Sequence, residues 1–474
     1  MAVVNSSRRH MLFGLAAGAG LAGIGRWAQA GSLTPQQQPL PEQTSFLIRR
    51  AIVITMDDEL GDFTEGDVLV RHGRIAQVGQ QLSAPDVAHV DGRGRIVFPG
   101  FIDAHNHMWQ TQMRGMFLQT PTSMFFPLTA KLESHFRPQD IAISEMLSAC
   151  ENAAAGITTS NDFFDNNRSP AYAEAAFNAL LKAPTRTRLL YGNRGKQDDQ
   201  PLDLDHLHIL EKCIPDEERD KLLLGLAWRL PRDLKSSRQW EIKRREYEVA
   251  REHQLPISVH VSGKQSNAMF QALIDGDYLF PGLQVVHASN ALHDHLQVLE
   301  QQGSSLALTP VTEQRVGFGT TRYSRYAHLR RLGLGIDGNG LAGVADMFAV
   351  MRLLAEIEIG ASQNQLSVDM RRLFRMATLG SACSMGLEHQ LGSLTPGKHA
   401  DIAMVNLNAW NLGMHPVDPI TLLVFAARPE NIEWVCVGGK VVKHDFKLVD
   451  HDPSSLLARA RKSAAHLAAS YQQA

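Results

Sequence analysis

Short apolar runs recur along the middle of the chain, and helical stretches lie between them, as in residues 171–182 and 236–253. Runs of this length, rich in aliphatic and β-branched residues, predict buried strands. Strands that alternate with helices are typical of a parallel sheet, and eight such units predict a closed (β/α)8 barrel. The eight expected strands are residues 100–105, 156–162, 187–193, 222–228, 256–261, 283–288, 305–310 and 332–337.

A second pattern flanks this region on both sides. Short β-branched runs punctuated by glycine, aspartate and other turn residues occur before the first barrel strand and again near the C-terminus. Two such blocks predict one small β-sandwich assembled from both ends of the chain. The expected fold class is therefore α/β, with a TIM-like barrel over residues 100–390 and a composite β-sandwich over residues 44–99 and 391–449. A C-terminal helix is expected over residues 450–474.

The N-terminal segment has the pattern of a targeting signal rather than of a folded domain. Arg8 and Arg9 precede a short apolar run rich in glycine and alanine, and an Ala-Gln-Ala cleavage site ends at Ala30. Paired arginines, a weakly apolar core and such a site are typical of a twin-arginine export signal, here residues 1–30. The run is shorter than the ~20 residues that span a bilayer, so no stable membrane insertion is expected after signal removal. Residues 31–43, rich in Gln and Pro, are expected to be a linker, and the protein to be periplasmic.

Composition narrows the class of partner. The chain has 474 residues, of which 44% are hydrophobic and 20% charged, as in an ordinary soluble globular protein. Its formal net charge of -2 gives no electrostatic case for binding nucleic acid or an anionic membrane surface. The four cysteines lie far apart without a CxxC pair, which argues against a thiolate zinc site. A small-molecule substrate is the expected partner, and the sequence leaves open whether the chain forms a homo-oligomer.

Three His-x-His pairs occur among the 20 histidines, and spacing alone does not distinguish them. About one such pair is expected by chance, so the motif by itself is weak. Only one pair ends a predicted barrel strand, where side chains two residues apart point the same way and can converge on one ion. The other two fall in helical stretches and are expected to be solvated surface. In chain order the pairs are His105/His107, His206/His208 and His293/His295.

Other polar residues stand at the ends of further barrel strands. His260 ends the fifth predicted strand, His287 the sixth and Asp337 the eighth. The chemistry of such barrels sits at the C-terminal ends of the strands, and burying these groups unpaired would be costly. Nitrogen and oxygen ligands of this kind suit zinc or iron(II), with an open position for water.

The region from Ser45 to Val449 resembles the amidohydrolase superfamily, in particular its cytosine deaminase and chlorohydrolase-like branch. The motifs that carry the resemblance are PGFIDAHNH, PISVHV, LQVVHA, LGLGIDG and ATLGSACSMGLEHQLGSLTPGKHADIAMV. The resemblance implies a metal-dependent hydrolase built on the barrel and sandwich described above.

The resemblance also implies roles for the strand-end residues. His105, His107, His260 and Asp337 would hold one divalent metal ion, zinc being the first expectation and iron(II) the alternative. His287 would orient the attacking water or polarise the substrate, and Asp337 would also act as general base. A single metal is expected because Trp228 and Arg229 stand where many binuclear relatives carry a carboxylated lysine.

One position departs from the pattern of the deaminase branch. That branch usually carries His-x-x-Glu after the fifth strand, and its Glu protonates a ring nitrogen, whereas this chain has Gly263 there. Glu313, after the seventh strand, could replace this acid, contact a basic group of the substrate, or be a solvated loop residue. Trp109, Gln110 and Arg114 are expected to wall the pocket, although Arg114 could instead pair with an inner carboxylate.

Two kinds of hydrolase and two other classes of function follow from these features. The first is an amidohydrolase that uses a metal-activated water to cleave a non-peptide C–N bond, of amide, lactam or amidine type, in a small molecule. The alternative is a hydrolytic deaminase or dechlorinase of an N-heterocycle with Glu313 as substitute acid; further alternatives are a metal-dependent lyase or isomerase, or a noncatalytic periplasmic binding protein. A binder needs no general base, so Asp337 favours a hydrolase, and Gly263 favours amide or lactam cleavage over ring deamination.

The export signal can be tested directly. Replacing Arg8 and Arg9 by lysine should leave the protein in the cytoplasm, because the twin-arginine pair is the recognised feature, and the mature wild-type chain should begin near Gly31. Cell fractionation and N-terminal sequencing measure both. A double variant that is still exported, or a mature chain that keeps residues 8–25, would contradict the prediction.

Overall fold

The computed structural model describes residues 44–193, 200–413 and 416–473. The predicted export signal and linker lie outside these residues, so they stay predictions. Within the described part of the chain, no helix combines the length and the apolar character that crossing a membrane requires.

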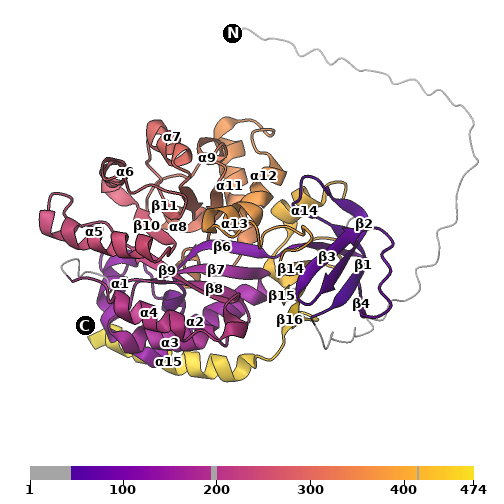
Figure 1. Ribbon diagram of the computed structural model, residues 1–474, viewed down its shortest axis with the longest axis horizontal. Helices are drawn as coiled ribbons and strands as arrows, with labels where there is room; N and C mark the ends of the chain where they lie inside the picture. The colour runs from indigo at the N-terminus through magenta and orange to yellow at the C-terminus, as the bar shows by residue number, and fades with distance from the viewer. Residues whose placement is uncertain (1–43, 194–199, 414–415, 474) are drawn as a thin grey trace, which may run out of the picture. The chain divides into compact units, whose positions relative to one another are not determined.

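Eight parallel strands form a barrel in which each strand pairs with the next one along the sequence (Figure 1). Each of them overlaps one of the eight stretches predicted from the apolar pattern, so the predicted barrel is confirmed. The strands are β6 (Phe101–Asn106), β7 (Ile157–Phe164), β8 (Arg186–Tyr191), β9 (Leu222–Trp228), β10 (Ile257–Val261), β11 (Leu283–His287), β12 (Ser305–Leu308) and β13 (Leu332–Leu334).

Closure of the barrel depends on contacts between the first strand and the segment after the last one. The backbone N–H of Asp337 donates to the carbonyl of His105 over 2.8 Å. The N–H of Ile336 donates to the Asp103 carboxylate over 2.9 Å. These bonds replace the ladder that would otherwise join β13 to β6, and they fix Asp337 beside His105.

Helices connect the strands and cover the outside of the barrel. The predicted helices at 171–182 and 236–253 correspond to α3 and α5; α5 begins where the Ser236 side chain accepts a hydrogen bond from the Gln239 N–H over 3.3 Å. From the barrel's start the helices are α1 (Phe125–Leu132), α2 (Pro138–Ala154), α3 (Pro170–Leu180), α4 (Leu204–Lys212), α5 (Ser237–Glu252), α6 (Ser266–Asp275), α7 (His293–Gln301), α8 (Pro310–Arg315), α9 (Tyr323–Tyr326), α10 (Asn339–Ala342), α11 (Met347–Ser362), α12 (Met370–Met376) and α13 (Leu379–Met385). Short 3-10 turns lie at η1 (Met108–Met113), η2 (Glu133–His135), η3 (Asp216–Glu218) and η4 (Gly263–Gln265).

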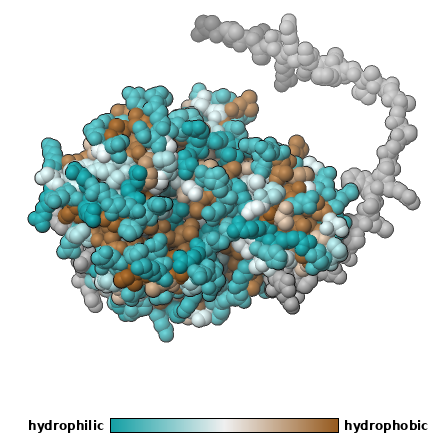
Figure 2. Space-filling model, viewed as in Figure 1, coloured by the Kyte–Doolittle hydropathy of each residue, from teal (hydrophilic) through white to brown (hydrophobic). Residues whose placement is uncertain are grey.

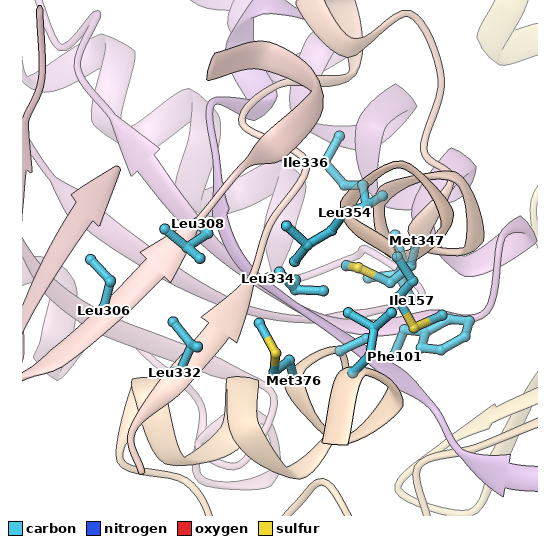
Figure 3. Packing of buried hydrophobic residues seen from close by; sticks show 14 of the residues in the cluster. Phe101, Ile157, Leu306, Leu308, Leu332, Leu334, Ile336, Met347, Leu354 and Met376 are labelled. Carbon is cyan, nitrogen blue, oxygen red and sulfur yellow. The ribbon is translucent and has the colours of Figure 1, made fainter. Parts of the chain in front are cut away.

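Alternation along the strands separates the interior of the barrel from its outer core. Leu306 and Leu308 of β12 belong to the apolar cluster that also contains Met347 of α11 and Met376 of α12 (Figure 3). Ala307, between the two leucines, instead packs with Ala104 and Val286, from strands that do not pair with each other. Small residues from separate strands meet in this way only inside a closed barrel.

The β domain predicted from both chain ends is present as one continuously hydrogen-bonded, nine-stranded mixed sheet. The seam is the antiparallel pair of β5 and β14, in which Pro99 stands opposite Ile402. The sheet curls over its own core, because Phe46 and Trp434, from strands that are not neighbours, have ring centroids 5.5 Å apart. Its strands are β1 (Phe46–Val53), β2 (Phe63–Arg71), β3 (Arg74–Gly79), β4 (Ala88–Asp91), β5 (Arg95–Pro99), β14 (Ile402–Asn406), β15 (Ile432–Val437), β16 (Lys440–His444) and β17 (Lys447–Leu448).

The C-terminal part of the chain returns to the barrel. The helix α14 (Pro419–Ala426) and the turn η5 (Pro429–Asn431) lie between β14 and β15, and α15 (Pro453–Gln473) ends the described chain. The Ser463 hydroxyl of α15 donates to Asp140 of α2, and Leu467 is buried in a cluster with residues of that helix. The face shown in Figure 2 is largely polar, with smaller apolar areas between, as expected for amphipathic helices that turn charged faces outward.

Candidate active site

Four side chains bring their ligand atoms together at the C-terminal end of the barrel. The Nε2 atom of His260 lies 3.2 Å from that of His105 and 3.2 Å from that of His107. One carboxylate oxygen of Asp337 lies 3.0 Å from His105 Nε2 and 3.6 Å from His107 Nε2. A tetrahedral zinc ion with ligands at ~2.0–2.1 Å holds those ligands about 3.3 Å apart. These four separations, 3.0 to 3.6 Å, are close to the spacing of ligands around one tetrahedral ion.

The backbone at two strand ends is held in an uncommon conformation that serves this convergence. His287 and Asp337 have φ values of 70° and 62°, in the left-handed region that few residues other than glycine adopt. Each turns the chain sharply at the end of its strand, so its side chain faces the mouth of the barrel. His287, which is not one of the four predicted ligands, belongs to the same group: potential metal-binding atoms of His105, His260, His287 and Asp337 all lie within 4.8 Å of one another. Backbone strain of this kind is often found at functional sites.

The charge state of three predicted ligands suits a divalent cation, whereas the pKa of His107 is shifted the other way: burial acts to lower it, but Asp165 outweighs burial and raises it. Burial lowers the pKa of His105 to about 4 and holds the pKa of His260 well below its usual range, so both imidazoles are neutral at neutral pH. Burial acts to raise the pKa of Asp337, but the neighbouring His287 and His105 outweigh it and lower that pKa. Neutral imidazoles and an ionised carboxylate are the forms that bind metal.

Asp165, which the sequence analysis did not single out, fixes the orientation of His107. Its carboxylate accepts a hydrogen bond from Trp109 Nε1 over 2.7 Å and lies 3.2 Å from His107 Nδ1. The Arg229 guanidinium donates to its other oxygen. Burial acts to raise the pKa of Asp165, but His107 and Arg229 outweigh it, so the group stays ionised. With Nδ1 held in this way, the ring of His107 turns Nε2 toward the other ligands. Carboxylates outside the ligand set orient metal-binding histidines in the same way.

Glu313 lies behind His287 instead of facing the substrate space. It is fully buried, accepts from the backbone N–H of Thr309 over 2.9 Å, and lies 3.3 Å from His287 Nδ1. The Thr321 hydroxyl donates to its second oxygen. The expectation that Glu313 contacts the substrate, replaces the missing acid or is a solvated loop residue is therefore corrected. The short helix α8 buries Glu313 against β11, where it positions His287.

The remaining predicted pocket residues divide into two groups. Trp109 and Gln110 line the cavity, and Gln110 Oε1 is buried without a partner among the described residues, so it can accept a hydrogen bond from a ligand. Arg114 does not line the cavity, and the prediction that it walls the pocket is wrong. The turn η1 carries Arg114 away, so that its side chain, 41% exposed, donates to Glu151 over 2.5 Å. The structural alternative considered for this arginine is the correct one.

A cavity of about 710 Å³ opens onto the ligand cluster. Its size suits a small organic molecule. Its walls are partly aromatic and partly polar, and include Phe126, Phe318, Gln110, Glu133, Arg232 and Lys264. Gly263 lies beside it: the nearest atom to a Cβ built there belongs to Phe318, 3.8 Å away. With φ of 72°, this position strongly favours glycine. The backbone conformation therefore disfavours an acidic side chain here.

The other two His-x-His pairs lie outside the ligand cluster, but the prediction that they are solvated surface is half wrong. His206 of α4 and His295 of α7 are buried, whereas His208 and His293 are exposed. Residues two apart on a helix point roughly 200° away from each other, so one imidazole faces the core and the other faces solvent. The same geometry prevents either pair from sharing one ion.

Comparison with known proteins gives one family and a consistent fold. The model of the amidohydrolase family matches residues 96–442, more than half of the chain. The 5′-deoxyadenosine deaminase of Methanobrevibacter smithii is 23% identical over 427 residues, which cover 85% of this chain and 94% of that protein. The zinc-bound adenosine deaminase of Xanthomonas campestris superposes with a TM-score of 0.76 at 21% identity, covering 90% of this chain and 100% of that one. Atrazine chlorohydrolase from Arthrobacter aurescens, solved with zinc, gives a TM-score of 0.77 at 23% identity, covering 88% of this chain and 100% of that one.

The metal content of the purified chain tests the ligand cluster. We expect about one divalent ion per chain in the wild type and loss of most of it in His105→Ala, because three ligands bind far more weakly than four. His206→Ala removes a buried histidine outside the cluster and is the matched control, which should keep its metal. Elemental analysis measures all three proteins. Two ions per chain, or full occupancy in His105→Ala, would rule out the single four-ligand site.

Proposed function

Because this chain belongs to the amidohydrolase family, we propose that it uses one zinc ion at the four-ligand cluster to hydrolyse an amide- or lactam-type C–N bond in a small molecule. The family makes it a hydrolase of C–N bonds other than peptide bonds. The observation that carries the proposal is the position of three imidazoles and the Asp337 carboxylate, spaced for one tetrahedral ion, at the floor of a cavity. Iron(II), which accepts the same ligands, is the alternative ion.

The protein's own groups divide the chemical work. A bound zinc ion supplies a water molecule of lowered pKa, close to ~7. Asp337, ionised and lining the cavity, would accept a proton from the water as its oxygen bonds to the carbonyl carbon, and would return that proton to the nitrogen as the C–N bond breaks. His287 Nδ1 lies 3.1 Å from the Thr309 hydroxyl and 3.3 Å from Glu313, so with Nδ1 donating to the carboxylate its Nε2 can accept a hydrogen bond from the water. Gln110 and the aromatic walls hold the substrate.

The choice of an amide or lactam follows from which acids face the cavity. Ring deamination requires an acid that protonates the ring nitrogen while water adds to the ring carbon. Gly263 offers none, Glu313 is occupied behind His287, and the acid that does line the cavity, Glu133, stands on η2 rather than after the fifth strand. In an amide or lactam, the nitrogen that accepts the proton is also the leaving group, so Asp337 alone can serve.

A second candidate is hydrolytic deamination of an adenosine-type or aminotriazine compound. It is favoured by the relatives, which include 5′-deoxyadenosine, adenosine and methylthioadenosine deaminases and a triazine chlorohydrolase. The acid would then be Glu133, whose side chain lines the same cavity from η2. Nothing in the described residues favours a lyase, an isomerase or a noncatalytic binder.

We also propose that the protein is exported to the periplasm in folded form. The support is the sequence of residues 1–30, with its arginine pair and small-residue cleavage site.

Replacing Asp337 by asparagine separates proton transfer from metal binding. Asparagine keeps the size and one oxygen ligand but accepts no proton, so kcat should fall by about 10²–10⁴-fold while part of the metal remains. The kcat for an amide that the wild type hydrolyses measures the first effect, and elemental analysis measures the metal content. A variant with near wild-type kcat would remove Asp337 from the mechanism.

A substrate panel with two glutamate variants decides between the two candidates. Amides and lactams should be hydrolysed faster than adenosine-type and aminotriazine compounds, and Glu133→Gln should leave amide turnover almost unchanged. Glu313→Gln is the contrasting variant: it loosens His287, so kcat should fall by about 10–100-fold, as when outer partners of a site are removed. Efficient aminopurine deamination that Glu133→Gln abolishes would instead establish the second candidate.

A further inference from the structure

A second cavity lies at the opposite end of the barrel from the candidate active site. Its volume is about 440 Å³, and its wall includes the start of β10 at Ile257 and Ser258 and the residue before β11, Gly282. His260 and His287 of the candidate active site stand at the other ends of these two strands. None of the residues that line this cavity lines the one above the ligand cluster.

The wall of this cavity carries a buried arginine with no partner. Arg188 of β8 is 6% exposed, and it makes no hydrogen bond or ion pair with any residue that the structure describes. Its Nε is among the buried donors that lack an acceptor. Burial alone lowers the pKa of Arg188 to about 10, so the guanidinium still carries its charge at neutral pH.

The contrast with a neighbouring arginine shows how unusual this is within the molecule. Arg186, two residues earlier on the same strand, is 3% exposed and pairs with Asp401 over 3.2 Å. The wall around Arg188 contains no aspartate or glutamate. It contains a second cation instead: Arg251, at the exposed rim, lies 3.8 Å over the Phe280 ring and donates to the Tyr247 hydroxyl.

Among the other polar groups of the floor, Asn161 Oδ1 is also buried without a partner in the described part of the chain, whereas Gln284 is fully hydrogen-bonded. Gln284 accepts from Ser258 over 2.9 Å and from Asn161 over 3.0 Å, and it donates to Ser384 over 2.8 Å. Water could satisfy the remaining donors of Arg188, but water does not neutralise a charge. A buried charge without a counter-charge is costly, and the cavity leaves room for one.

We propose that this cavity binds a small oxyanion, a phosphate or a carboxylate, on the guanidinium of Arg188. The planar fork of a guanidinium matches two oxygens of such an anion, and Arg251 adds positive charge at the entrance. The anion supplies the missing counter-charge at the N-terminal end of the barrel. Ser258, on the cavity floor, stands two residues before His260 on β10, so occupancy stabilises the strands that carry the ligand histidines. This site does not depend on which C–N bond the enzyme cleaves.

The experiment compares thermal unfolding and calorimetric binding of the metal-loaded full chain, with inorganic phosphate and with acetate, at constant ionic strength. Saturating phosphate should raise the wild-type unfolding midpoint by at least about 2 °C, since a ligand that binds only the folded state stabilises it. Arg188→Met, close in volume, should lose that rise, and Arg188→Lys should keep a smaller one. Without either anion, Arg188→Met should unfold at the same temperature as the wild type or higher, because it removes an uncompensated charge.

Lys264→Met is the control for binding in the other cavity, where Lys264 lines the wall, and it should keep the full rise. A larger rise with acetate than with phosphate assigns the site to carboxylates. The proposal fails if neither anion shifts the wild type, if Arg188→Met retains the shift, or if Lys264→Met loses it. It also fails if Arg188→Met is destabilised equally with and without anion, because Arg188 would then be a structural residue only.

Discussion

The hydrogen bond from the Asp337 N–H to the His105 carbonyl is the contact on which the site depends. It joins the first strand of the barrel to the segment after the last one, over 2.8 Å, where no regular ladder connects β13 and β6. The same bond sets the carboxylate of Asp337 3.0 Å from His105 Nε2. Closing the sheet and assembling the metal ligands are therefore one event. A sheet left open at this seam would leave Asp337 and the paired histidines at opposite edges, too far apart to share an ion.

Buried acids outside the ligand cluster hold the imidazoles in place. Asp165 fixes the ring of His107, and Glu313 fixes the ring of His287, each through the Nδ1 atom. Both carboxylates have further donors, Trp109 and Arg229 for the first and Thr309 and Thr321 for the second. The buried charge of Asp165 is tolerated because it is paired with Arg229 and accepts a further hydrogen bond from Trp109. The cost of orienting the ligands is met during folding, so the site is preorganised for the cation.

Two further positions bear on the chemistry at the two ends of the barrel. Gly263 places no acidic side chain beside the cavity. Its backbone is in the left-handed region, so an acidic residue at this position would require a different backbone conformation. Arg188 places an uncompensated charge at the far end of the barrel, although the neighbouring Arg186 is paired in the ordinary way. The first bears on which bond is cleaved, whereas the second concerns the stability of the strands that carry the ligands.

The sequence alone determined the strands and the barrel, and it placed the four residues predicted to bind metal at the ends of barrel strands. Each apolar run is local, and strand ends such as His105, His260 and Asp337 are read directly from it, because parallel strands place their C-terminal ends on one face. Side-chain direction, in contrast, depends on contacts between distant segments. The sequence leaves Arg114 open between the pocket wall and a pair with an inner carboxylate, and η1 turns it toward Glu151. It leaves Glu313 open between a substitute acid, a substrate contact and a solvated loop residue, and α8 instead buries it behind His287. The sequence around Asp165 and Arg188 does not indicate their roles. Asp165 acts by orienting His107, and Arg188 is notable because no acidic residue that the structure describes pairs with it, and both facts depend on residues far away in the chain. Pairing of buried charges is decided only when the tertiary structure brings the partners together or fails to.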